Sequence, residues 1–133
     1  MGYIGTGRGA TGCGPRFTDL LDGTVRDNAN GAVWQQAVDA GSYTQAGAIA
    51  YCAGLPLDGG GWRLPTKDEL LSVVDTRFVS TIDPTYFPGT PADFFWSSSF
   101  VVWSPSYKWY VYFNTGNAGY NVAASAYRAR CVR

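Results

Sequence analysis

The segment from Gly60 to Leu71, Gly-Gly-Trp-Arg-Leu-Pro-Thr-Lys-Asp-Glu-Leu-Leu, constrains the fold more than any other part of the chain. Pro65 restricts the residue before it to extended conformations, so the chain arrives as a strand or tight turn. Thr66 then takes the N-cap position, and Glu69 can complete a capping box. We expect a short helix that begins after Thr66 and ends near Asp75, and we assign this segment a scaffolding role.

A second helix is expected upstream, over Thr44 to Leu55, where Gly54 and Pro56 end it. Small apolar residues recur there at helical spacing and predict a narrow stripe that packs against a sheet. The expected stripe consists of Ala46, Ile49, Ala50 and Ala53.

Strands are expected on both sides of the helices. Phe17 to Gln36 predicts an antiparallel meander, because Asp-Gly and Asn-Gly dipeptides typical of tight turns separate short runs of strand formers. Residues 76–95 are rich in proline and predict a long loop held by aromatic side chains. The expected C-terminal elements are strands Phe95–Trp103, Lys108–Phe113 and Tyr127–Val132, with a turn at Asn114–Gly119.

Alternation along the strand at 108–113 predicts two faces. Trp109, Val111 and Phe113 are expected in the core, and Tyr110 and Tyr112 on the opposite face. Aromatics make up 16% of this chain, more than we expect a domain of this size to bury, so several should lie on the surface. Rigid aromatic rings beside Asn and Ser side chains are typical of recognition surfaces. The expected ligand-binding residues are Trp103, Tyr107, Tyr110, Tyr112, Asn114, Asn117, Tyr120, Asn121 and Tyr127.

Composition excludes several classes of function. Ten basic and ten acidic residues leave no basic field for nucleic acid. No apolar run is long enough to insert into a membrane. The chain lacks histidine, the commonest general base and metal ligand, so we expect no catalytic residues, no cofactor and no metal site. Three cysteines are too few for a closed zinc site. Residues 1–15 are expected to be a glycine-rich leader and 16–133 a single domain.

A set of short motifs in a fixed order resembles the bacterial DUF1566 family, which includes the C-terminal domain of the Legionella collagen-like adhesin. The resemblance covers about Arg16 to Arg133. It is carried by Phe17-Thr18-Asp19, Asp22-Gly23-Thr24-Val25, Val33-Trp34-Gln35, Ala50-Tyr51-Cys52, Trp62-Arg63-Leu64-Pro65-Thr66, Ile82-Asp83-Pro84, Phe87-Pro88, Phe95-Trp96-Ser97-Ser98-Ser99 and Arg130-Cys131-Val132-Arg133.

This resemblance implies an α+β, C-type-lectin-like fold, with two helices flanking a small antiparallel sheet and long loops. In that fold the first helix and the last strand are neighbours, which implies a disulfide between Cys52 and Cys131 and leaves Cys13 free or paired between chains. It also implies an extracellular or cell-surface location and a homotrimer, since adhesin-type relatives are trimeric.

Calcium-dependent lectins of this fold carry Glu-Pro-Asn or Gln-Pro-Asp with Trp-Asn-Asp, and none of these tripeptides occurs here. Calcium sites of another kind stay open. Formylglycine-generating enzymes share the fold class but use a cysteine pair that the last third of this chain lacks. We therefore expect a non-enzymatic recognition or adhesion domain at the tip of a surface or fibre protein. Its expected partner is a glycan or a surface protein of a host, prey or neighbouring cell. The alternative is a structural or assembly module of such a protein.

Overall fold

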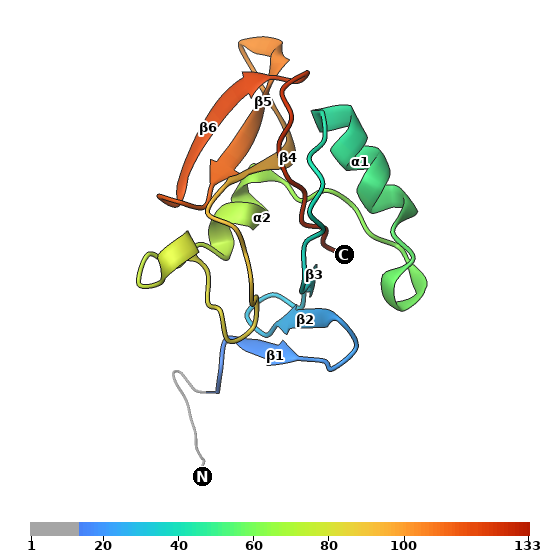
Figure 1. Ribbon diagram of the computed structural model, residues 1–133, viewed down its shortest axis with the longest axis vertical. Coiled ribbons are helices and arrows are strands. Elements are labelled where there is room, and N and C mark those ends of the chain that lie inside the picture. The colour runs from blue at the N-terminus through green and yellow to red at the C-terminus, as the bar shows by residue number, and fades with distance from the viewer. Residues whose placement is uncertain (1–13) are drawn as a thin grey trace.

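The structure is a computed structural model that describes residues 14–133 (Figure 1). It contains two small antiparallel sheets and two α-helices, with a long looped segment between the second helix and the second sheet. Most of the predicted leader, and Cys13 with it, lies outside the described residues. The predicted α+β class is confirmed, but the single expected sheet is replaced by two.

The first sheet has the order β1-β2-β3 and consists of β1 (Phe17–Asp19), β2 (Thr24–Asp27) and β3 (Val33–Gln35). It is the predicted meander. The turns take a positive φ at Gly23 (88°) and at Gly31 (77°), which glycine adopts without steric cost.

The second sheet has the order β4-β5-β6 and consists of β4 (Phe94–Val101), β5 (Ser104–Tyr112) and β6 (Asn117–Val122). Here the prediction of a turn over Asn114–Gly119 is wrong in part. The hairpin turn occupies only 113–116, and 117–122 pairs along β5 as a strand. Asn and Gly residues favour turns in isolation, but β5 offers a full row of backbone partners that extends the pairing into them.

Both predicted helices are present. α1 (Gln45–Gly54) begins after Thr44, whose hydroxyl accepts from the Gly47 N–H at 3.1 Å. α2 (Lys67–Ser72) has the predicted capping box. The Thr66 hydroxyl accepts from the Glu69 N–H at 3.2 Å, and the Glu69 carboxylate accepts from the Thr66 N–H at 2.8 Å. α2 ends earlier than expected, and two 3-10 turns, η1 (Leu57–Gly59) and η2 (Val79–Thr81), complete the elements.

The helices cover opposite faces of the second sheet. Leu70 of α2 lies in one core cluster with Val111 and Phe113. Cys52 of α1 lies in a second cluster with Trp96, against which Tyr110 packs. Successive residues of a strand point to opposite faces, so the sheet separates the two clusters.

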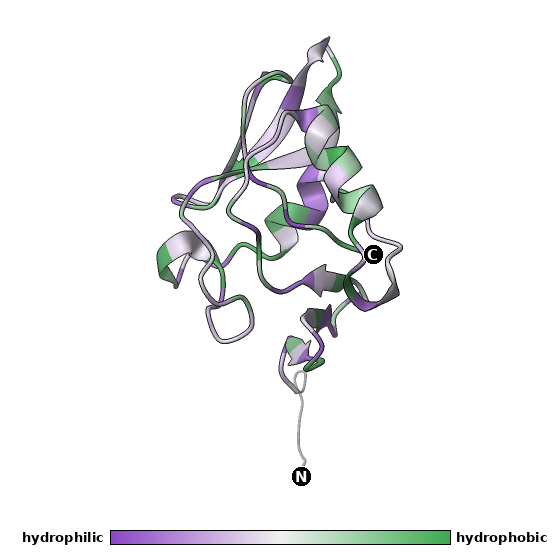
Figure 2. Ribbon diagram, turned by 45° about the vertical axis from the view of Figure 1, so that its right-hand side comes forward, coloured by the Kyte–Doolittle hydropathy of each residue, from purple (hydrophilic) through white to green (hydrophobic). Residues whose placement is uncertain are grey.

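The predicted inward face of α1 is wrong. Gln45, Ala48 and Cys52 are buried, and Ile49 is 43% exposed. The other members of the predicted stripe, Ala46, Ala50 and Ala53, are also exposed. Figure 2 shows several hydrophobic positions along α1. A hollow of about 400 Å³ runs between α1 and the segment at 62–66, and Ile49 and Ala53 contribute to its lining.

The C-terminal segment 127–133 ties the two sheets together. It makes separate bridges, from Tyr127 to Tyr43, from Arg128 to β4, and from Val132 to Trp34 and Arg63. The predicted continuous strand over Tyr127–Val132 is therefore wrong, because the segment changes its partner every few residues.

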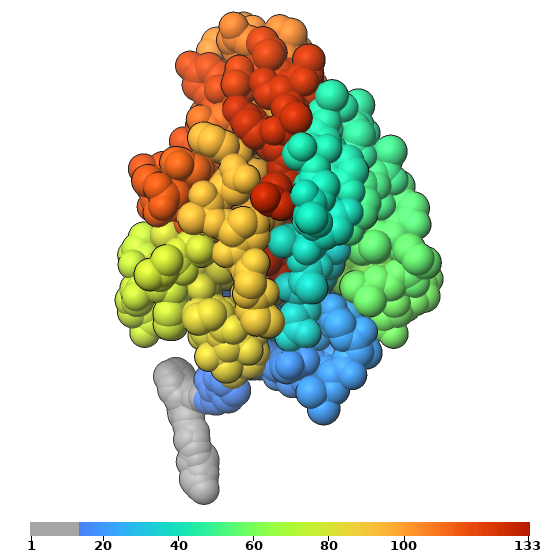
Figure 3. Space-filling view, viewed as in Figure 1, coloured from blue at the N-terminus to red at the C-terminus, as the bar shows by residue number. Residues whose placement is uncertain are grey.

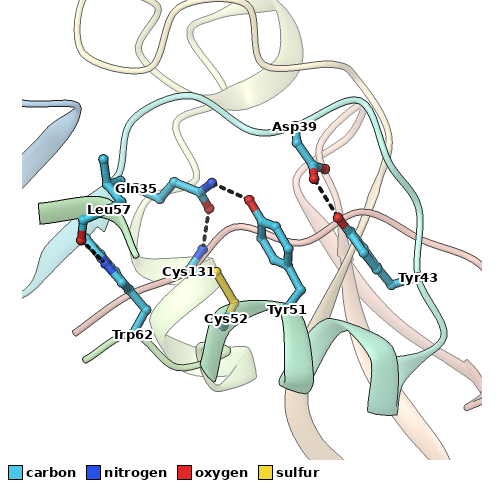
Figure 4. Close-up of a disulfide and its surroundings, with 8 residues drawn as sticks. All are labelled: Gln35, Asp39, Tyr43, Tyr51, Cys52, Leu57, Trp62 and Cys131. Carbon is cyan, nitrogen blue, oxygen red and sulfur yellow. Dashed lines mark hydrogen bonds between the residues drawn. A yellow bond between two sulfur atoms is a disulfide. The ribbon is translucent and has the colours of Figure 1, made fainter. Parts of the chain in front are cut away.

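A disulfide joins Cys52 to Cys131, as the resemblance implied (Figure 4). Gln35 reinforces this junction. The side-chain NH2 group of Gln35 donates to the Tyr51 hydroxyl at 2.8 Å, and its side-chain carbonyl oxygen accepts from the Cys131 N–H at 3.0 Å. The disulfide thus joins α1 to the C-terminal segment, and hydrogen bonds of Gln35 attach the first sheet at the same place.

A buried arginine holds the looped segment. Arg130 is 1% exposed and donates to the carbonyl oxygens of Gln35 and Gln36 at 2.6 and 2.7 Å. It also donates to the Thr90 hydroxyl at 2.7 Å, and its guanidinium lies over the buried Phe87 ring. Burial lowers the pKa of Arg130 to about 9, so the group is still charged at neutral pH. The loop is pinned by an aromatic side chain, as expected, and by this cation.

Candidate functional site

An exposed group of four aromatic rings lies at the outer end of the second sheet. We call Trp103, Tyr107, Trp109 and Tyr120 the aromatic platform. Tyr120 is its centre, with ring centroids 6.1 Å from Trp103, 5.8 Å from Tyr107 and 5.2 Å from Trp109. Trp103 is 70% exposed, Tyr120 45% and Tyr107 36%, whereas Trp109 is half-buried. The platform rings therefore pack against one another and are still exposed to solvent.

Strand geometry explains why the rings gather. Tyr107 and Trp109 are two residues apart on β5 and so share a face. Tyr120 on β6 lies directly opposite Trp109, and the turn between β4 and β5 brings Trp103 over the same face. The upper end of the molecule in Figure 3, coloured orange to red, is formed by these C-terminal strands.

One lysine and one valine border the platform. The Lys67 ammonium, at the start of α2, lies 4.5 Å from the centre of the Trp109 ring. This contact holds one edge of the platform to the helix through a cation–π attraction. Val122 is exposed and lies opposite Tyr107 across β5 and β6, so it extends the apolar surface on the same face. The result is an amphipathic surface whose flat rings can stack on a sugar ring or on an apolar side chain.

A second aromatic group lies on the other face of the same sheet. We call Phe94, Trp96, Tyr110, Tyr112 and Tyr127 the closed cluster. Phe94 is its centre, with its ring stacked on Tyr112 at 4.0 Å and on Tyr127 at 4.9 Å. Tyr127 also contacts Trp96 at 4.7 Å and Tyr110 at 5.4 Å. The C-terminal segment supplies Tyr127 and thereby covers this face.

Gly119 on β6 gives Tyr110 its place in the closed cluster. A Cβ at this position would lie 2.5 Å from the Tyr110 hydroxyl oxygen, so only glycine lets the ring lie flat across the neighbouring strand. Burial raises the pKa of Tyr110, as expected for a phenol that has lost part of its hydration.

The predicted binding residues are therefore divided between two surfaces. Trp103, Tyr107 and Tyr120 belong to the platform. Tyr110 and Tyr112 do lie opposite Val111, as alternation predicted, but both are half-buried, because Phe94 packs against both rings and Tyr127 of the C-terminal segment packs against Tyr110. The single continuous surface expected from the sequence is thus corrected to two separate groups. Tyr127 is the third predicted residue that falls in the closed cluster.

The asparagines are also divided. Asn121 donates to the Tyr127 hydroxyl at 2.9 Å and accepts from the Val122 N–H at 2.8 Å, so its amide is engaged locally. Asn114 and Asn117 are exposed near the β5–β6 turn, at the end of β5 remote from Trp103. Neither adjoins the platform.

Sequence reasoning missed Trp109 as a surface residue. It was assigned to the core because Val111 and Phe113 share its face, and those two are indeed buried. α2 covers that face only over its inner part, so the same row of side chains passes from core to platform along β5. The alternation along β5 correctly predicted which face Trp109 lies on. It could not predict how far α2 extends over that face.

Within residues 14–133, no group of three or more Cys, Asp or Glu side chains is placed to hold a metal ion. In the same part of the chain, no helix has the length and apolarity needed to cross a membrane.

Comparisons with known proteins place the chain in a family. No curated protein matches it. The Lcl C-terminal domain family matches residues 23–133, which include both sheets except β1, both helices, the disulfide and the platform. The chain therefore belongs to the Lcl C-terminal domain family.

Proposed function

We propose that this domain is a non-enzymatic recognition or adhesion module that binds its ligand on the aromatic platform. The observation that carries the proposal is the exposure of Trp103, Tyr120 and Tyr107 in one contiguous group, whereas the other aromatic rings of residues 14–133, Phe100 excepted, are buried or half-buried. Contiguous exposed apolar surface on a soluble domain commonly marks an interaction site.

The geometry supports recognition rather than catalysis. Each platform ring is fixed by at least one other ring, so little side-chain entropy is lost when a ligand binds. Platform side chains offer stacking surfaces, hydroxyls and an indole N–H, but no nucleophile paired with a base. The ligand class we propose is a glycan or a surface protein of a host, prey or neighbouring cell, bound without cofactor or metal.

Family membership supports the setting of this proposal. The Lcl C-terminal domain is a domain of a bacterial surface-associated collagen-like protein, which favours an extracellular or cell-surface location. We propose that the domain stands at the tip of such a surface or fibre protein. We also propose that its fold is C-type-lectin-like, because two helices flank the second sheet and the C-terminal segment returns to the first.

The test is binding of the purified domain to a glycan array and to intact cells, for the native chain and for two variants. Trp103→Ala removes the most exposed platform ring, and Val79→Ala removes an even more exposed apolar side chain elsewhere. Selective loss of binding in the Trp103 variant, with binding by Val79→Ala intact, supports the proposal. A chelator should have no effect. Equal binding by all three proteins would place the recognition surface elsewhere.

A second candidate function is assembly, in which the domain packs against other copies within a fibre, for example as a homotrimer. The observation that favours it is an open strand edge on β6, where the outward backbone groups of Ala118 and Tyr120 have no partner among the described residues. Solution mass separates the two candidates. A monomer that binds a ligand favours recognition, and an assembly that covers the platform favours the second reading.

A further inference from the structure

The turn between β4 and β5 consists of residues that turn chemistry does not explain. Val101 pairs with Ser104, so Val102 and Trp103 alone form the connection. Two-residue hairpin loops are usually built from Asn, Asp and Gly, whose backbones adopt the required conformations easily. Here Val102 is 80% exposed and Trp103 is 70% exposed. Two large apolar side chains thus lie in solvent where small or polar residues are usual.

Exposed apolar side chains continue from this turn along both faces of the second sheet. Phe100 pairs with Lys108 and is 54% exposed, and the Lys108 ammonium lies 5.9 Å from the centre of its ring, so the two share a face. Tyr107 precedes Lys108 and therefore points to the other face, where Tyr120 lies beside it. We define the hairpin tip as the exposed residues Phe100, Val102, Trp103, Tyr107 and Tyr120.

The hairpin tip lies at one extremity of the molecule. Figures 1 and 2 both place the turn between β4 and β5 at one end of the longest axis, and the first sheet lies at the other end. A protruding turn can reach a flat surface without interference from the rest of the domain. This position favours an extended target over a ligand that must be enclosed in a groove.

The part of the chain that forms the tip is almost free of charge. From Phe94 to Tyr127, Lys108 is the only charged residue, although 15% of the whole chain is charged. Moving this hairpin toward an apolar medium would therefore desolvate one cation of its own and no carboxylate. A lysine can lay its methylene groups along apolar surface and keep its ammonium in a polar layer. The charge pattern is thus compatible with contact at a lipid surface.

We propose that the hairpin tip inserts into the headgroup region of a phospholipid bilayer and so holds the domain at a lipid surface. Trp and Tyr are enriched at this depth, because their rings are apolar and carry a polar group. Phe100 and Val102 supply the apolar side chains that reach the boundary with the acyl chains. A bilayer surrounds an inserted tip on all sides, whereas a sugar stacks on one face and leaves Phe100 and Val102 in water.

This activity goes beyond ligand binding on the platform and does not rest on it. Trp103, Tyr107 and Tyr120 belong to both surfaces, but Phe100 and Val102 belong to the tip alone. The tip is assembled by the fold from three separate segments, so no long apolar run predicts it from the sequence. It would lie in the interface without spanning the bilayer.

The test is cosedimentation of the full chain with vesicles of phosphatidylcholine, alone or mixed equally with phosphatidylglycerol. The native chain should bind both, and so should Val79→Ser, the matched control at an exposed valine elsewhere. Phe100→Ser and Val102→Ser should each bind about tenfold more weakly, because each removes an apolar side chain from the tip. Phosphatidylglycerol should raise the native affinity about fivefold, and Lys108→Gln should reduce that gain.

Fluorescence of the native chain gives a readout that needs no variant to fold. Lipids with brominated acyl chains should quench Trp103, and Trp103→Phe should lose most of the quenching, because the other tryptophans are buried or half-buried. Glycan-array and cell binding by Phe100→Ser and Val102→Ser should stay native, since neither residue belongs to the platform. An array without ligands would leave vesicle binding intact, so the two proposals fail separately.

Three results would overturn the lipid proposal. One is a native chain that stays in the supernatant with both vesicles and is not quenched. Another is native vesicle binding by folded Phe100→Ser and Val102→Ser. The third is self-association of the native chain that these two substitutions abolish, without vesicle binding, which would assign the tip to a second copy.

Discussion

The two faces of the second sheet carry similar aromatic residues but differ in how far other segments of the chain cover them. The platform and the closed cluster both consist of tyrosines and other aromatic residues, and both take two of their rings from β5. On one face α2 stops short and leaves Trp103 and Tyr120 in solvent. On the other face Phe94 and Tyr127 lie over Tyr110 and Tyr112.

The difference shows that residue type did not assign these roles. A tyrosine has a structural role where another segment of the chain packs against it, and it is exposed to solvent where no segment does. The covering segment on the closed face is the C-terminal one, which the disulfide fixes to α1. Changes on the closed face should therefore affect stability, and changes on the platform should affect binding.

The largest effect is expected from the disulfide that supports the closed face. Replacing Cys52 and Cys131 with alanine opens a link between residues 79 positions apart. The free energy of unfolding should fall by roughly 2–5 kcal/mol, because the unfolded chain gains freedom. Urea unfolding of the double variant against the native chain measures this. A loss below about 1 kcal/mol would mean that the junction holds without the covalent bond.

The next effect concerns the centre of the closed cluster. Phe94→Ala removes a ring that contacts Tyr110, Tyr112 and Tyr127, and should cost about 2–3 kcal/mol of stability because the half-buried site loses contacts and leaves a gap. Trp103→Ala is the matched change on the platform and should alter stability by less than about 1 kcal/mol. Equal costs for the two variants would contradict the distinction between the faces.

A smaller effect is expected at α2, which borders the platform but presents no ring to it. Thr66→Ala removes the capping hydroxyl and should cost about 1 kcal/mol. Ligand binding should be unchanged, since Lys67 keeps its place over Trp109 once the helix forms. Thr66→Ser retains a hydroxyl and serves as the control. Lost affinity at an unchanged melting temperature would make the segment part of the binding site.

The smallest effect is one of pH and belongs to the closed side. Burial, with the hydrogen bond from the Tyr43 hydroxyl to Asp39, raises the pKa of Tyr43 to about 12 (Figure 4). The pKa of an unfolded tyrosine is about 10. The folded state thus holds its proton more tightly, and this contribution is complete below pH 10 and is lost as pH rises toward 12. Urea unfolding between pH 10 and 12 should show that the free energy of unfolding falls more steeply with pH for the native chain than for Tyr43→Phe. An equal fall for the two proteins would contradict this role of Tyr43.

Local chemistry was predictable from the sequence. The capping box of Thr66 and Glu69 depends on four consecutive residues, and the turns of the first sheet on single dipeptides, so no distant partner was needed. The inward face of α1 was not predictable in this way, because small apolar residues occur on both sides of the helix. The disulfide and Trp96 determine which side turns inward.

Features that depend on distant segments were less predictable. β6 has the composition of a turn and is a strand because β5 pairs with it. The partial burial of Tyr110 depends on the path of the C-terminal segment, which supplies Tyr127, and this path cannot be predicted from the alternation within 108–113. An exposed aromatic group does lie in the last third of the chain, but the predicted residues fall on two surfaces instead of one, and ligand binding there stays a prediction.

The most direct test of the account compares Tyr120→Ala with Tyr112→Ala, measuring both the unfolding free energy and binding to the ligand found on the array or cell surface. We expect Tyr120→Ala to lose about 2 kcal/mol of binding free energy, with nearly native stability. Tyr112→Ala should lose about 1–2 kcal/mol of stability and bind normally at temperatures where it is folded. The reverse pattern, a destabilised Tyr120 variant beside a stable, non-binding Tyr112 variant, would contradict the assignment of the platform as the recognition surface.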